Sequence, residues 1–424
     1  MEPGLGEREA EAHVGGICFK TGPPQRTGVE LEWLVRDRAD PQAFVPARRL
    51  DAALAPLERP GGLPGGSALT REPGGQVELS TRPAASLPEC VRAAATDFTC
   101  LRQALAAAGL EPAGLGLDPH RSPPRIVDHP RYRAMEAYFD RIGPWGRVMM
   151  RATAALQISL DAGDDTDGVT GYRYRWRLAH RLGPVLVAAF ANSPLWRGRP
   201  TGWVSTRQAL WARLDPQRTR PPEGSADPRT AWTRHALDAP LLCVRRTPPA
   251  AWTAPSGLTF RAWLCAAHSG PPPRLADLDY HLGTLFPPVR PRGWMELRMI
   301  DAQQGDQWVV PLAVTATLLD DPLAAVTAYE ATEHLTRGSH FPGPDVWLRA
   351  ARSGPADPEL GKASRACLTA AVTALARYPA SRDLARAVAG FADRYSERGR
   401  CPADDQLAVL RDGAPSTYRE GTWP

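Results

Sequence analysis

Lysine is almost absent from this chain. Among the 51 basic residues of the 424-residue sequence, only Lys20 and Lys362 are lysines, and the others are arginines. Nearly all fixed positive charge is therefore guanidinium, a planar group that binds carboxylates and phosphates through paired hydrogen bonds. A bound phosphate must accordingly be held by arginine and metal rather than by lysine.

Other absences exclude several classes of protein. No apolar run approaches the roughly 18 residues of a membrane span, and the first residues lack the basic and apolar regions of a secretory signal. The seven cysteines form no C-x-x-C pair, which favours a reduced, cytoplasmic protein. A net charge of +5 is too small to indicate nucleic-acid binding. We therefore expect a cytoplasmic protein with neither a membrane nor a nucleic-acid partner.

Common nucleotide, zinc and hydrolase motifs are also missing. The sequence contains no G-x-x-x-x-G-K-[ST], no G-x-G-x-x-G after a strand, no H-E-x-x-H and no G-x-S-x-G. Glycine and proline, with 37 and 44 residues, are plentiful instead. They gather in four predicted loops, none of which is biased enough to be an interdomain linker, so residues 1–424 are expected to form a single domain. The loops are Arg59–Gly75, Leu110–Pro124, Asp215–Pro228 and Ser269–Arg274.

Four segments alternate apolar and polar residues, which is the period of a strand with one buried face. They are far apart in the sequence and separated by helical patterns, which predicts an α+β fold rather than a βαβ series. Helices would cover the apolar face of the sheet and leave the other face polar. The apolar positions are Val29, Leu31 and Trp33; Val77 and Leu79; Leu156, Ile158 and Leu160; and Met295, Leu297 and Met299.

Helical periodicity, with apolar residues at three- and four-residue steps, dominates elsewhere. It is almost continuous past residue 300, so the C-terminal part from about residue 333 is expected to be mostly helical. The predicted helices are Pro41–Leu57, Leu87–Ala108, Tyr132–Ile142, Gly171–Ala191, Thr206–Arg213, Thr230–Leu237, Gln307–Leu319, Pro322–Glu333, Glu359–Ala376 and Ser381–Tyr395.

The polar face of the predicted strands is strongly acidic. Glu30 and Glu32 lie two residues apart on one strand, so their side chains point the same way, about 7 Å apart. Two carboxylates at that spacing repel by about 2 kcal/mol at an effective dielectric near 20. Glu78 and Glu296 would add to this repulsion if their strands are neighbours, and Mg²⁺ prefers such oxygen ligands. The alternative is that each strand has an ordinary solvated face.

Arginine and tryptophan suggest a site for an anion. Arg207 and Trp211 are four residues apart on a predicted helix and so share one face, and the following turn could present Arg218. A guanidinium beside an indole is a plausible clamp for a carboxylate; the alternative is a surface arginine stacked on tryptophan. Arg298 lies on the acidic strand face, where it would bind an anionic substrate or phosphate or pair with Glu296.

Together, the motifs resemble those of glutamate–cysteine ligases, in the plant-type branch and most closely the bacterial ligases that open ergothioneine synthesis. The motifs follow one another in unbroken order from Gly28 to Thr332. They are Gly28-Val29-Glu30-Leu31-Glu32, Glu72-Pro73-Gly74-Gly75-Gln76-Val77-Glu78-Leu79-Ser80, Arg131-Tyr132-x-x-Met135, Met149-Met150-Arg151-Ala152-Thr153, Leu156-Gln157-Ile158-Ser159-Leu160-Asp161, Phe190-Ala191-Asn192-Ser193-Pro194, Ser205-x-Arg207-x-x-x-Trp211-x-x-x-Asp215-x-x-Arg218-Thr219, Gly257-Leu258-Thr259-Phe260-Arg261, and Met295-Glu296-Leu297-Arg298-x-x-Asp301.

The resemblance implies an ATP- and Mg²⁺-dependent enzyme that joins the γ-carboxylate of L-glutamate to the amine of L-cysteine through a γ-glutamyl phosphate. It implies a glutamine synthetase-like catalytic fold with a curved, mainly antiparallel sheet and helices on its outer face, as a monomer or homodimer. A same-fold ligase with another amine acceptor and a non-catalytic arginine-rich binding module are the alternatives. The implied roles are metal binding for Glu30, Glu32, Glu72, Glu78, Gln157 and Glu296, phosphate neutralisation for Arg298, and glutamate binding for Arg131, Trp211 and Arg218, with Tyr132 and Arg207 as nearby candidates.

Overall fold

The computed structural model describes residues 5–222, 227–247, 249–265 and 271–413. Parts of two predicted loops, residues 223–226 and 269–270, lie outside the described residues. At the centre is a seven-stranded sheet in which every pairing is antiparallel. The strands are β1 (Thr27–Asp37), β2 (Ala68–Arg71), β3 (Val77–Ser80), β4 (Leu110–Ala113), β5 (Ala155–Asp161), β8 (Val289–Pro291) and β9 (Trp294–Asp301).

The four strands expected from alternation are neighbours in this sheet. Their order is β3-β1-β5-β9, with β2 and β8 at the two edges and β4 paired with the second half of β1. The predicted α+β class with an antiparallel sheet is therefore confirmed. A β-bulge interrupts the β5–β9 pairing, because Ile158 pairs with Leu297 but Leu156 pairs with Ile300. The extra residue on β9 lies next to Arg298, and bulges of this kind commonly re-aim side chains beside active sites.

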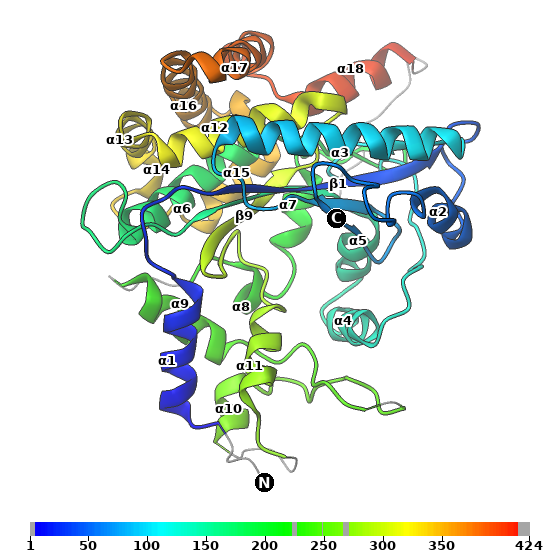
Figure 1. Ribbon diagram of the computed structural model, residues 1–424, viewed down its shortest axis with the longest axis vertical. Coiled ribbons are helices and arrows are strands. Elements are labelled where there is room, and N and C mark those ends of the chain that lie inside the picture. Colours follow the sequence, from blue (N-terminus) through cyan, green and yellow to red (C-terminus); the bar gives the residue numbers. More distant parts are fainter. Residues whose placement is uncertain (1–4, 223–226, 248, 266–270, 414–424) are drawn as a thin grey trace.

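The apolar face of the sheet packs against helices, as the alternation predicts. Trp33 of β1 stacks on Phe98 of α3 (Leu87–Ala107) with ring centroids 4.3 Å apart. Helices α12 (Val309–Asp320) and α6 (Tyr172–Ala189) contribute further buried residues to the same core. In Figure 1, α3 and α12 run above the sheet. Pro311 lies in the first turn of α12, where its missing N–H has no intrahelical partner to lose, whereas Pro184 lies inside α6.

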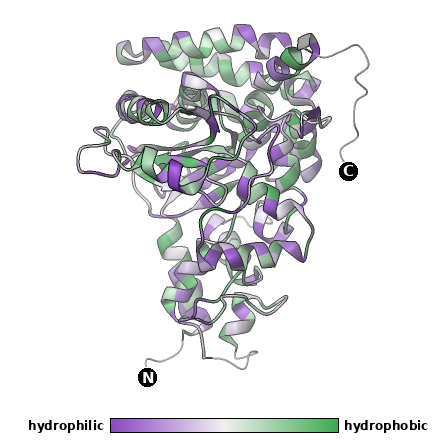
Figure 2. Ribbon diagram, turned by 90° about the vertical axis from the view of Figure 1, so that its right-hand side faces the viewer, coloured by the Kyte–Doolittle hydropathy of each residue, from purple (hydrophilic) through white to green (hydrophobic). Residues whose placement is uncertain are grey.

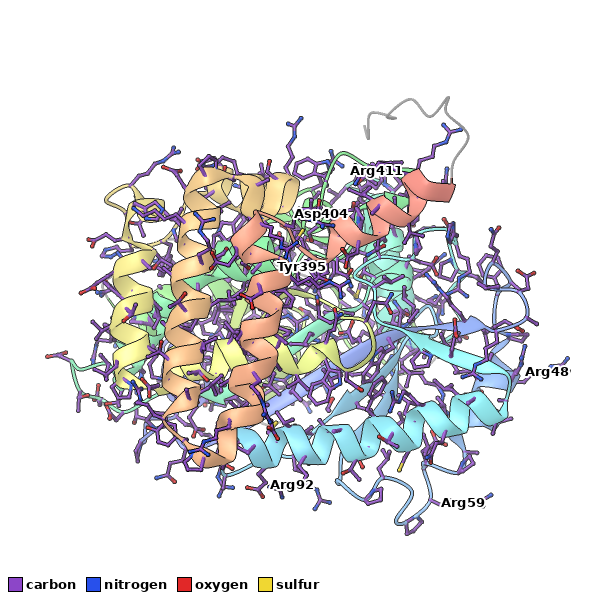
Figure 3. All side chains as sticks on the ribbon, turned by 90° about the horizontal axis from the view of Figure 1, so that it is seen from above. Arg48, Arg59, Arg92, Tyr395, Asp404 and Arg411 are labelled. Atoms are coloured by element: carbon purple, nitrogen blue, oxygen red, sulfur yellow. The ribbon has the colours of Figure 1, made fainter. Side chains whose placement is uncertain are left out.

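After β9, the described part of the chain forms helices only. Of these, α13, α16 and α17 pack against α12 as a second layer, and α15 packs against α6 and α7 (Thr206–Trp211); Figure 3 shows α16 and α17 side by side over the sheet. No single described helix is long and apolar enough to cross a membrane; the bent pair Gly305–Asp320 and Pro322–Ala331 meets the test of length and composition only jointly. The helices are α13 (Pro322–Ala331), α14 (Glu333–Thr336), α15 (Pro344–Ser353), α16 (Pro358–Ala376), α17 (Arg382–Arg394) and α18 (Pro402–Gly413).

The polar face of the sheet is also covered, which the sequence did not predict. Seen from the side (Figure 2), the sheet lies between the upper helices and a narrower lower group of helices and loops. This lower group turns the expected open face into the wall of a cavity. Its helices are α1 (Glu7–Cys18), α4 (Pro130–Asp140), α5 (Trp145–Ala152), α7 (Thr206–Trp211), α8 (Pro216–Thr219), α9 (Pro228–Asp238), α10 (Phe260–Leu264) and α11 (Leu275–Leu282).

Several predicted boundaries were wrong for local reasons. The helix expected over Pro41–Leu57 is shortened to α2 (Ala47–Leu54), because Pro46 adopts an extended conformation (ψ 141°) at its N-cap. The predicted loops Arg59–Gly75 and Leu110–Pro124 contain β2 and β4. Both strands lie inside stretches rich in glycine and proline, whose turn signal outweighs a short alternation. A two-stranded hairpin, β6 (Leu195–Trp196) with β7 (Arg199–Pro200), was missed for the same reason.

Candidate active site

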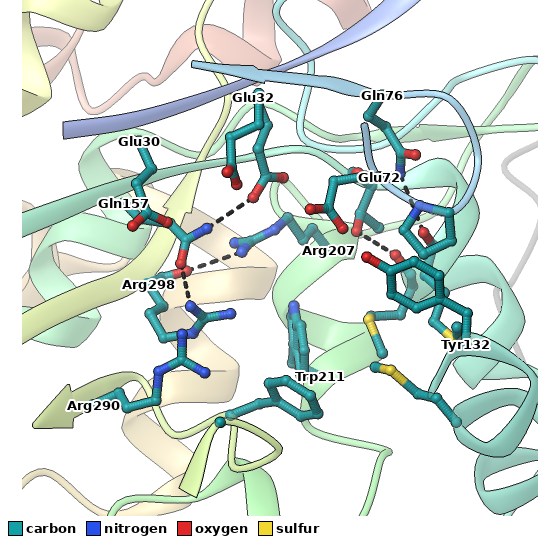
Figure 4. Close-up of a pocket in the computed structure, with 18 of the residues that line it drawn as sticks. Glu30, Glu32, Glu72, Gln76, Tyr132, Gln157, Arg207, Trp211, Arg290 and Arg298 are labelled. Atoms are coloured by element: carbon teal, nitrogen blue, oxygen red, sulfur yellow. Dashed lines mark hydrogen bonds between the residues drawn. The ribbon is translucent and has the colours of Figure 1, made fainter. Parts of the chain in front are cut away.

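A cavity of about 360 Å³ lies between the polar face of the sheet and the lower helices. This volume is within the range of small-molecule sites. Figure 4 shows Glu30, Glu32 and Gln157 on the sheet side with Arg290 and Arg298 below them, and Trp211 and Tyr132 toward the other end. All predicted site residues except Glu296 and Arg218 line the cavity. The predicted residues in its wall are Glu30, Glu32, Glu72, Glu78, Arg131, Tyr132, Gln157, Arg207, Trp211 and Arg298.

The strand register explains why the carboxylates meet. Glu32 pairs with Glu78 across β1 and β3, and Glu30 pairs with Gln157 across β1 and β5. Burial raises the pKa of Glu30 to about 7, with further rises from Glu296 and Glu78. Burial also raises the pKa of Glu78, and the neighbouring Glu32 adds to that rise. The face therefore favours a proton or a cation over four bare negative charges.

Glu72 enters the cavity from the turn between β2 and β3. Its backbone N–H donates to the Gln76 carbonyl at 2.8 Å, and the buried Gln76 amide donates to the Thr153 carbonyl at 2.8 Å. Gly74 is required there, because a Cβ at that position would lie 2.0 Å from the Arg151 carbonyl oxygen. Burial raises the pKa of Glu72 to about 8, with Glu78 as the next cause. Glu30 and Glu72 accept no side-chain hydrogen bond from the described residues.

A chain of hydrogen bonds joins the two sides of the acidic face. The Gln157 amide donates to Glu32 Oε1 at 2.8 Å, and the amide of Ala155 donates to Glu32 Oε2 at 2.8 Å. Arg298 donates to the Gln157 carbonyl oxygen and also to Glu296 Oε1, the latter at 3.0 Å. Gln157 thus holds Glu32 through its amide group and Arg298 through its oxygen.

Glu296 lies behind the cavity wall, at 0% exposure. Arg290 of β8 donates to both of its oxygens, at 2.6 and 3.0 Å, in a bidentate pair. Although burial opposes it, Arg290 and Arg298 lower the pKa of Glu296 to about 2. Arg290 and Arg292 line the cavity but were not among the predicted site residues. The alternation of Val289-Arg290-Pro291-Arg292 was the signal that could have revealed them, since it places both arginines on one face.

The other end of the cavity is arginine and aromatic. Arg131 and Tyr132 begin α4, and Arg131 donates to the Gly283 carbonyl at 2.7 Å. Trp211 of α7 packs near Phe286, with ring centroids 5.8 Å apart. The Trp211 indole Nε1 is buried and has no hydrogen-bond partner among the described residues. An unpartnered donor in the wall of a cavity is suited to a ligand acceptor.

Arg207 and Arg218 differ in what their guanidinium groups contact. Arg207 is 4% exposed and lines the cavity, where its charge opposes the rise in the pKa of Glu32. Arg218 is 0% exposed and lies outside the cavity wall. It donates to the Thr284 carbonyl at 2.6 Å and to the Pro240 carbonyl. Its predicted contact with glutamate would therefore require these bonds to change.

Sequence comparison identifies the protein family. Residues 26–421 match the sequence model of glutamate-cysteine ligase family 2, GCS2. The chain belongs to this family. It is 40% identical over 403 residues to the glutamate–cysteine ligase EgtA of Mycobacterium tuberculosis, covering 93% of this chain and 88% of that protein. It is also 40% identical to EgtA of Mycolicibacterium smegmatis over 419 residues, covering 97% and 94%.

More distant similarities extend over plant enzymes and solved structures. The chloroplastic glutamate–cysteine ligase of Medicago truncatula is 30% identical over 252 residues, or 58% of this chain and 48% of that protein. A glutamate–cysteine ligase from Francisella tularensis in complex with AMP is 11% identical, with a TM-score of 0.39, over 93% of this chain and 96% of that one. A bifunctional glutathione synthetase from Pasteurella multocida is 13% identical, with a TM-score of 0.49, over 97% and 52%. Membership of GCS2 rests on the sequence match.

Members of an ATP-dependent ligase family handle a nucleotide and, as a rule, a divalent metal. The donor set of this cavity suits Mg²⁺, because it consists of glutamate oxygens and one amide. The unpartnered carboxylates of Glu30 and Glu72, whose pKa values are raised, are the groups that a cation would stabilise. No three His, Cys, Asp or Glu side chains of the described residues stand in metal-binding geometry. The glutamates must therefore turn toward an ion when one binds.

Proposed function

We propose that this enzyme couples the γ-carboxylate of L-glutamate to the amine of L-cysteine at the expense of ATP. The product would be γ-glutamylcysteine, used for ergothioneine synthesis as the sequence resemblance implies. The observation that supports this proposal is that one cavity brings the glutamates of the sheet together with arginines from α4, α7 and the β8–β9 hairpin and with Trp211. GCS2 membership along residues 26–421 supports the same reaction class.

The reaction requires activation of a carboxylate. An amine cannot displace oxide from a carboxylate, so the γ-phosphoryl group of ATP is transferred to the glutamate γ-carboxylate, giving an acyl phosphate. The cysteine amine then attacks the carbonyl carbon, and phosphate leaves. Both reactants of the first step are anions, so positive charge must be concentrated where they meet. Arg298 is placed for this role, because it lies on β9 beside Gln157 and Glu296 at the acidic end.

Mg²⁺ would be held by Glu30, Glu32, Glu72 and Glu78, with Gln157 and Glu296 as the remaining proposed ligands. When bound, it would neutralise the ATP phosphates and the developing charge on the transferred group. Binding at Glu296 would require exchange with Arg290, which occupies both of its oxygens. Arg290, Arg292 and Arg298 would then remain as fixed positive charges around the phosphates.

The opposite end of the cavity would bind glutamate. Arg131 and Arg207 supply guanidinium groups for a carboxylate, and the Trp211 indole supplies a free N–H. Tyr132 lies beside Glu72, whose charge contributes, after burial, to raising the Tyr132 pKa to about 12. The tyrosine therefore stays a neutral hydroxyl donor at neutral pH. Arg218 would act on this end through the Thr284–Phe286 segment that it supports.

The decisive experiment measures ADP release and product together. Purified full-length protein is incubated with ATP, Mg²⁺ and L-glutamate, and with L-cysteine, other amino acids or ammonia as the acceptor. We expect γ-glutamylcysteine, identified by mass, only when cysteine is present. Hydroxylamine in place of cysteine should trap the acyl phosphate as γ-glutamyl hydroxamate. If ADP forms with another amino acid or with ammonia but not with cysteine, then cysteine is not the acceptor.

The assembly and domain organisation belong to the same proposal. We propose one catalytic ligase domain over residues 1–424, with the helices from about residue 333 as its C-terminal part, working in the cytoplasm as a monomer or homodimer. The helices after β9 share their buried core with the sheet and α3, which supports a single unit. A single cooperative unfolding transition observed by two spectroscopic probes would agree with this organisation, and two separate transitions would contradict it.

A further inference from the structure

Asp301 lies at the end of β9, behind the cavity, and is 2% exposed. One oxygen accepts the backbone N–H of Asn192 at 2.9 Å and the hydroxyl of Ser193 at 2.7 Å. The other accepts the hydroxyl of Ser205 at 3.1 Å. The carboxylate therefore joins three segments that are distant in sequence, at the motifs around residues 190–194, 205–219 and 295–301.

The same carboxylate is the counter-charge of Arg207. Arg207 Nη1 lies 3.7 Å from Asp301 Oδ1, and both side chains are buried. Burial raises the pKa of Asp301, and Arg207 with the three hydrogen-bond donors opposes that rise. Arg207 itself forms part of the cavity wall. A buried charge needs such a partner to remain ionised at low cost, so Asp301 determines where the Arg207 charge is located.

Arg207 in turn contacts the backbone of β9 at its bulge. Its Nη2 donates to the Arg298 carbonyl at 2.9 Å, and its Nη1 donates to the Ile300 carbonyl at 3.5 Å. At this bulge the extra residue of β9 leaves backbone groups without a strand partner. From the bulge, the Arg298 side chain extends to Gln157 and donates a hydrogen bond to it. The orientation of Arg298 is thereby coupled to Arg207 and so to Asp301.

The surroundings leave Asp301 little freedom to move. A Cβ on Gly116 would lie 2.4 Å from the Asp301 carboxyl carbon, so only glycine allows this approach. The Asn192 side chain is held by donating to the Gly114 and Ala302 carbonyls at 2.9 and 2.8 Å. Gln406 of α18 donates to the Asn192 side-chain oxygen at 2.7 Å. The C-terminal helix is therefore attached to the same network.

We propose that Asp301 is a positioning residue, whose buried carboxylate holds the Arg207 guanidinium and the β9 bulge in the geometry that binds L-glutamate. The proposal rests on the proposed function, in which Arg207 contacts glutamate. Asp301 touches no substrate and acts through Arg207. Its removal should therefore change glutamate binding, with little change in the affinity for cysteine.

The test compares Asp301→Asn with wild type in the full chain. Asparagine keeps the size and one acceptor but places a neutral group opposite Arg207. We expect the KM for glutamate to rise about 10- to 100-fold, as for the loss of an outer partner of a site residue, while the KM for cysteine stays within about twofold. Asp321→Asn is the matched control, because Asp321 is also buried, accepts two backbone N–H groups and pairs with Arg377, on the far layer of helices.

Three further variants make the result decisive. Arg207→Gln and the double variant Asp301→Asn/Arg207→Gln complete a double-mutant cycle. If Asp301 acts through Arg207, the double variant is no worse than Arg207→Gln alone; additive losses overturn the proposal. Ser193→Ala removes one hydrogen bond to Asp301 and keeps its charge. This variant should raise the KM for glutamate by a smaller factor. If Asp301→Asn does not fold, Ser193→Ala serves as the test in its place. An unchanged KM in Ser193→Ala would then contradict the proposal.

Direct binding separates this proposal from the ligase assignment. Calorimetric titration of L-glutamate into wild type, Asp301→Asn and Asp321→Asn requires no turnover. Absence of γ-glutamylcysteine from wild type would reject the ligase function, whereas the titration still reports on Asp301. Equal glutamate affinity in wild type and Asp301→Asn, or an equal loss in the Asp321→Asn control, would show that Asp301 only supports the fold.

Discussion

Glu32 and Glu78 face each other directly across the β1–β3 pair, with their carboxylates in the same buried cavity. Like charges in this arrangement destabilise a sheet. Burial raises the pKa of both groups, and Glu32 adds to the rise at Glu78. The fold therefore retains an unfavourable arrangement at the position where the proposed reaction needs oxygen ligands for a cation. Stability and function should be separable there by substitution.

Glu78→Gln should stabilise the metal-free protein and abolish ligation. The amide keeps an oxygen for the Thr70 and Ser80 hydroxyls, which donate at 2.8 and 2.9 Å, but removes one of the facing charges. The expected gain in the free energy of unfolding is about 1 kcal/mol, measured by denaturant titration without Mg²⁺. Glu330→Gln on the exposed side of α13 is the control and should change neither stability nor turnover. A destabilised or fully active Glu78→Gln enzyme would contradict the charge-cluster interpretation.

Stability of the metal-free protein should decrease with increasing pH above neutrality. The pKa values of about 7 for Glu30 and about 8 for Glu72 lie above the ordinary 4.5. The folded state therefore binds these protons more tightly than the unfolded state, so its stability falls as pH rises through these values. We expect the melting temperature to drop between pH 6.5 and 8.5 without Mg²⁺. The variant Glu30→Gln/Glu72→Gln should show a flatter profile.

Between pH 6.5 and 8.5, neither the buried histidines nor Glu296 should change the stability of the protein with pH. Burial lowers the pKa of His180 and His235 to about 4 and of His281 to about 3, so their stabilising effect is lost below pH 6.5, where the unfolded state gains protons. Glu296, with a pKa of about 2, contributes stability that is lost only in acid. Adding Mg²⁺ should raise the melting temperature more at pH 8.5 than at pH 6.5. An equal Mg²⁺ effect at both values would argue against carboxylate ligation.

Arg290→Met should destabilise the protein strongly. Both oxygens of the buried Glu296 bond to Arg290, and removing one partner of a buried pair typically costs about 3–5 kcal/mol. Chemical unfolding should show this loss, together with a raised pKa of Glu296. Arg292→Met is the comparison, since Arg292 lines the same cavity but is exposed, and it should cost under about 1 kcal/mol. Equal effects of the two substitutions would contradict a special role of the Arg290–Glu296 pair.

Trp211→Phe should weaken substrate binding more than the fold. The substitution removes the indole N–H, which has no hydrogen-bond partner among the described residues, together with the second ring of the side chain. We expect the KM for glutamate to rise about 10-fold, as for a lost hydrogen bond to a charged group, and the melting temperature to fall because the smaller ring leaves a gap in the packing. Trp308→Phe is the matched control, because the Trp308 N–H is likewise buried and unpartnered, at the start of α12. An unchanged KM in Trp211→Phe would remove Trp211 from the proposed glutamate site.

The sequence determined β1, β3, β5 and β9 and most of the upper helical layer, because their residues repeat at periods that local geometry sets. Alternation around Glu30, Glu32, Glu78 and Gln157 also placed these side chains on one face. It missed Arg290 on a three-residue strand, where too few residues repeat. The strands and helices that were predicted depend on the spacing of nearby residues, and a single sequence shows that spacing.

Only the tertiary structure decided how the strands and helices meet. The register that sets Glu32 opposite Glu78, the bulge beside Arg298 and the placement of α4 and α7 over the polar face are contacts between segments far apart in the chain. The same holds for Glu296, which the sequence suggested as an exposed ligand and the fold buried against Arg290. Such contacts depend on packing and on the burial of charge, which act only once distant parts of the chain are brought together.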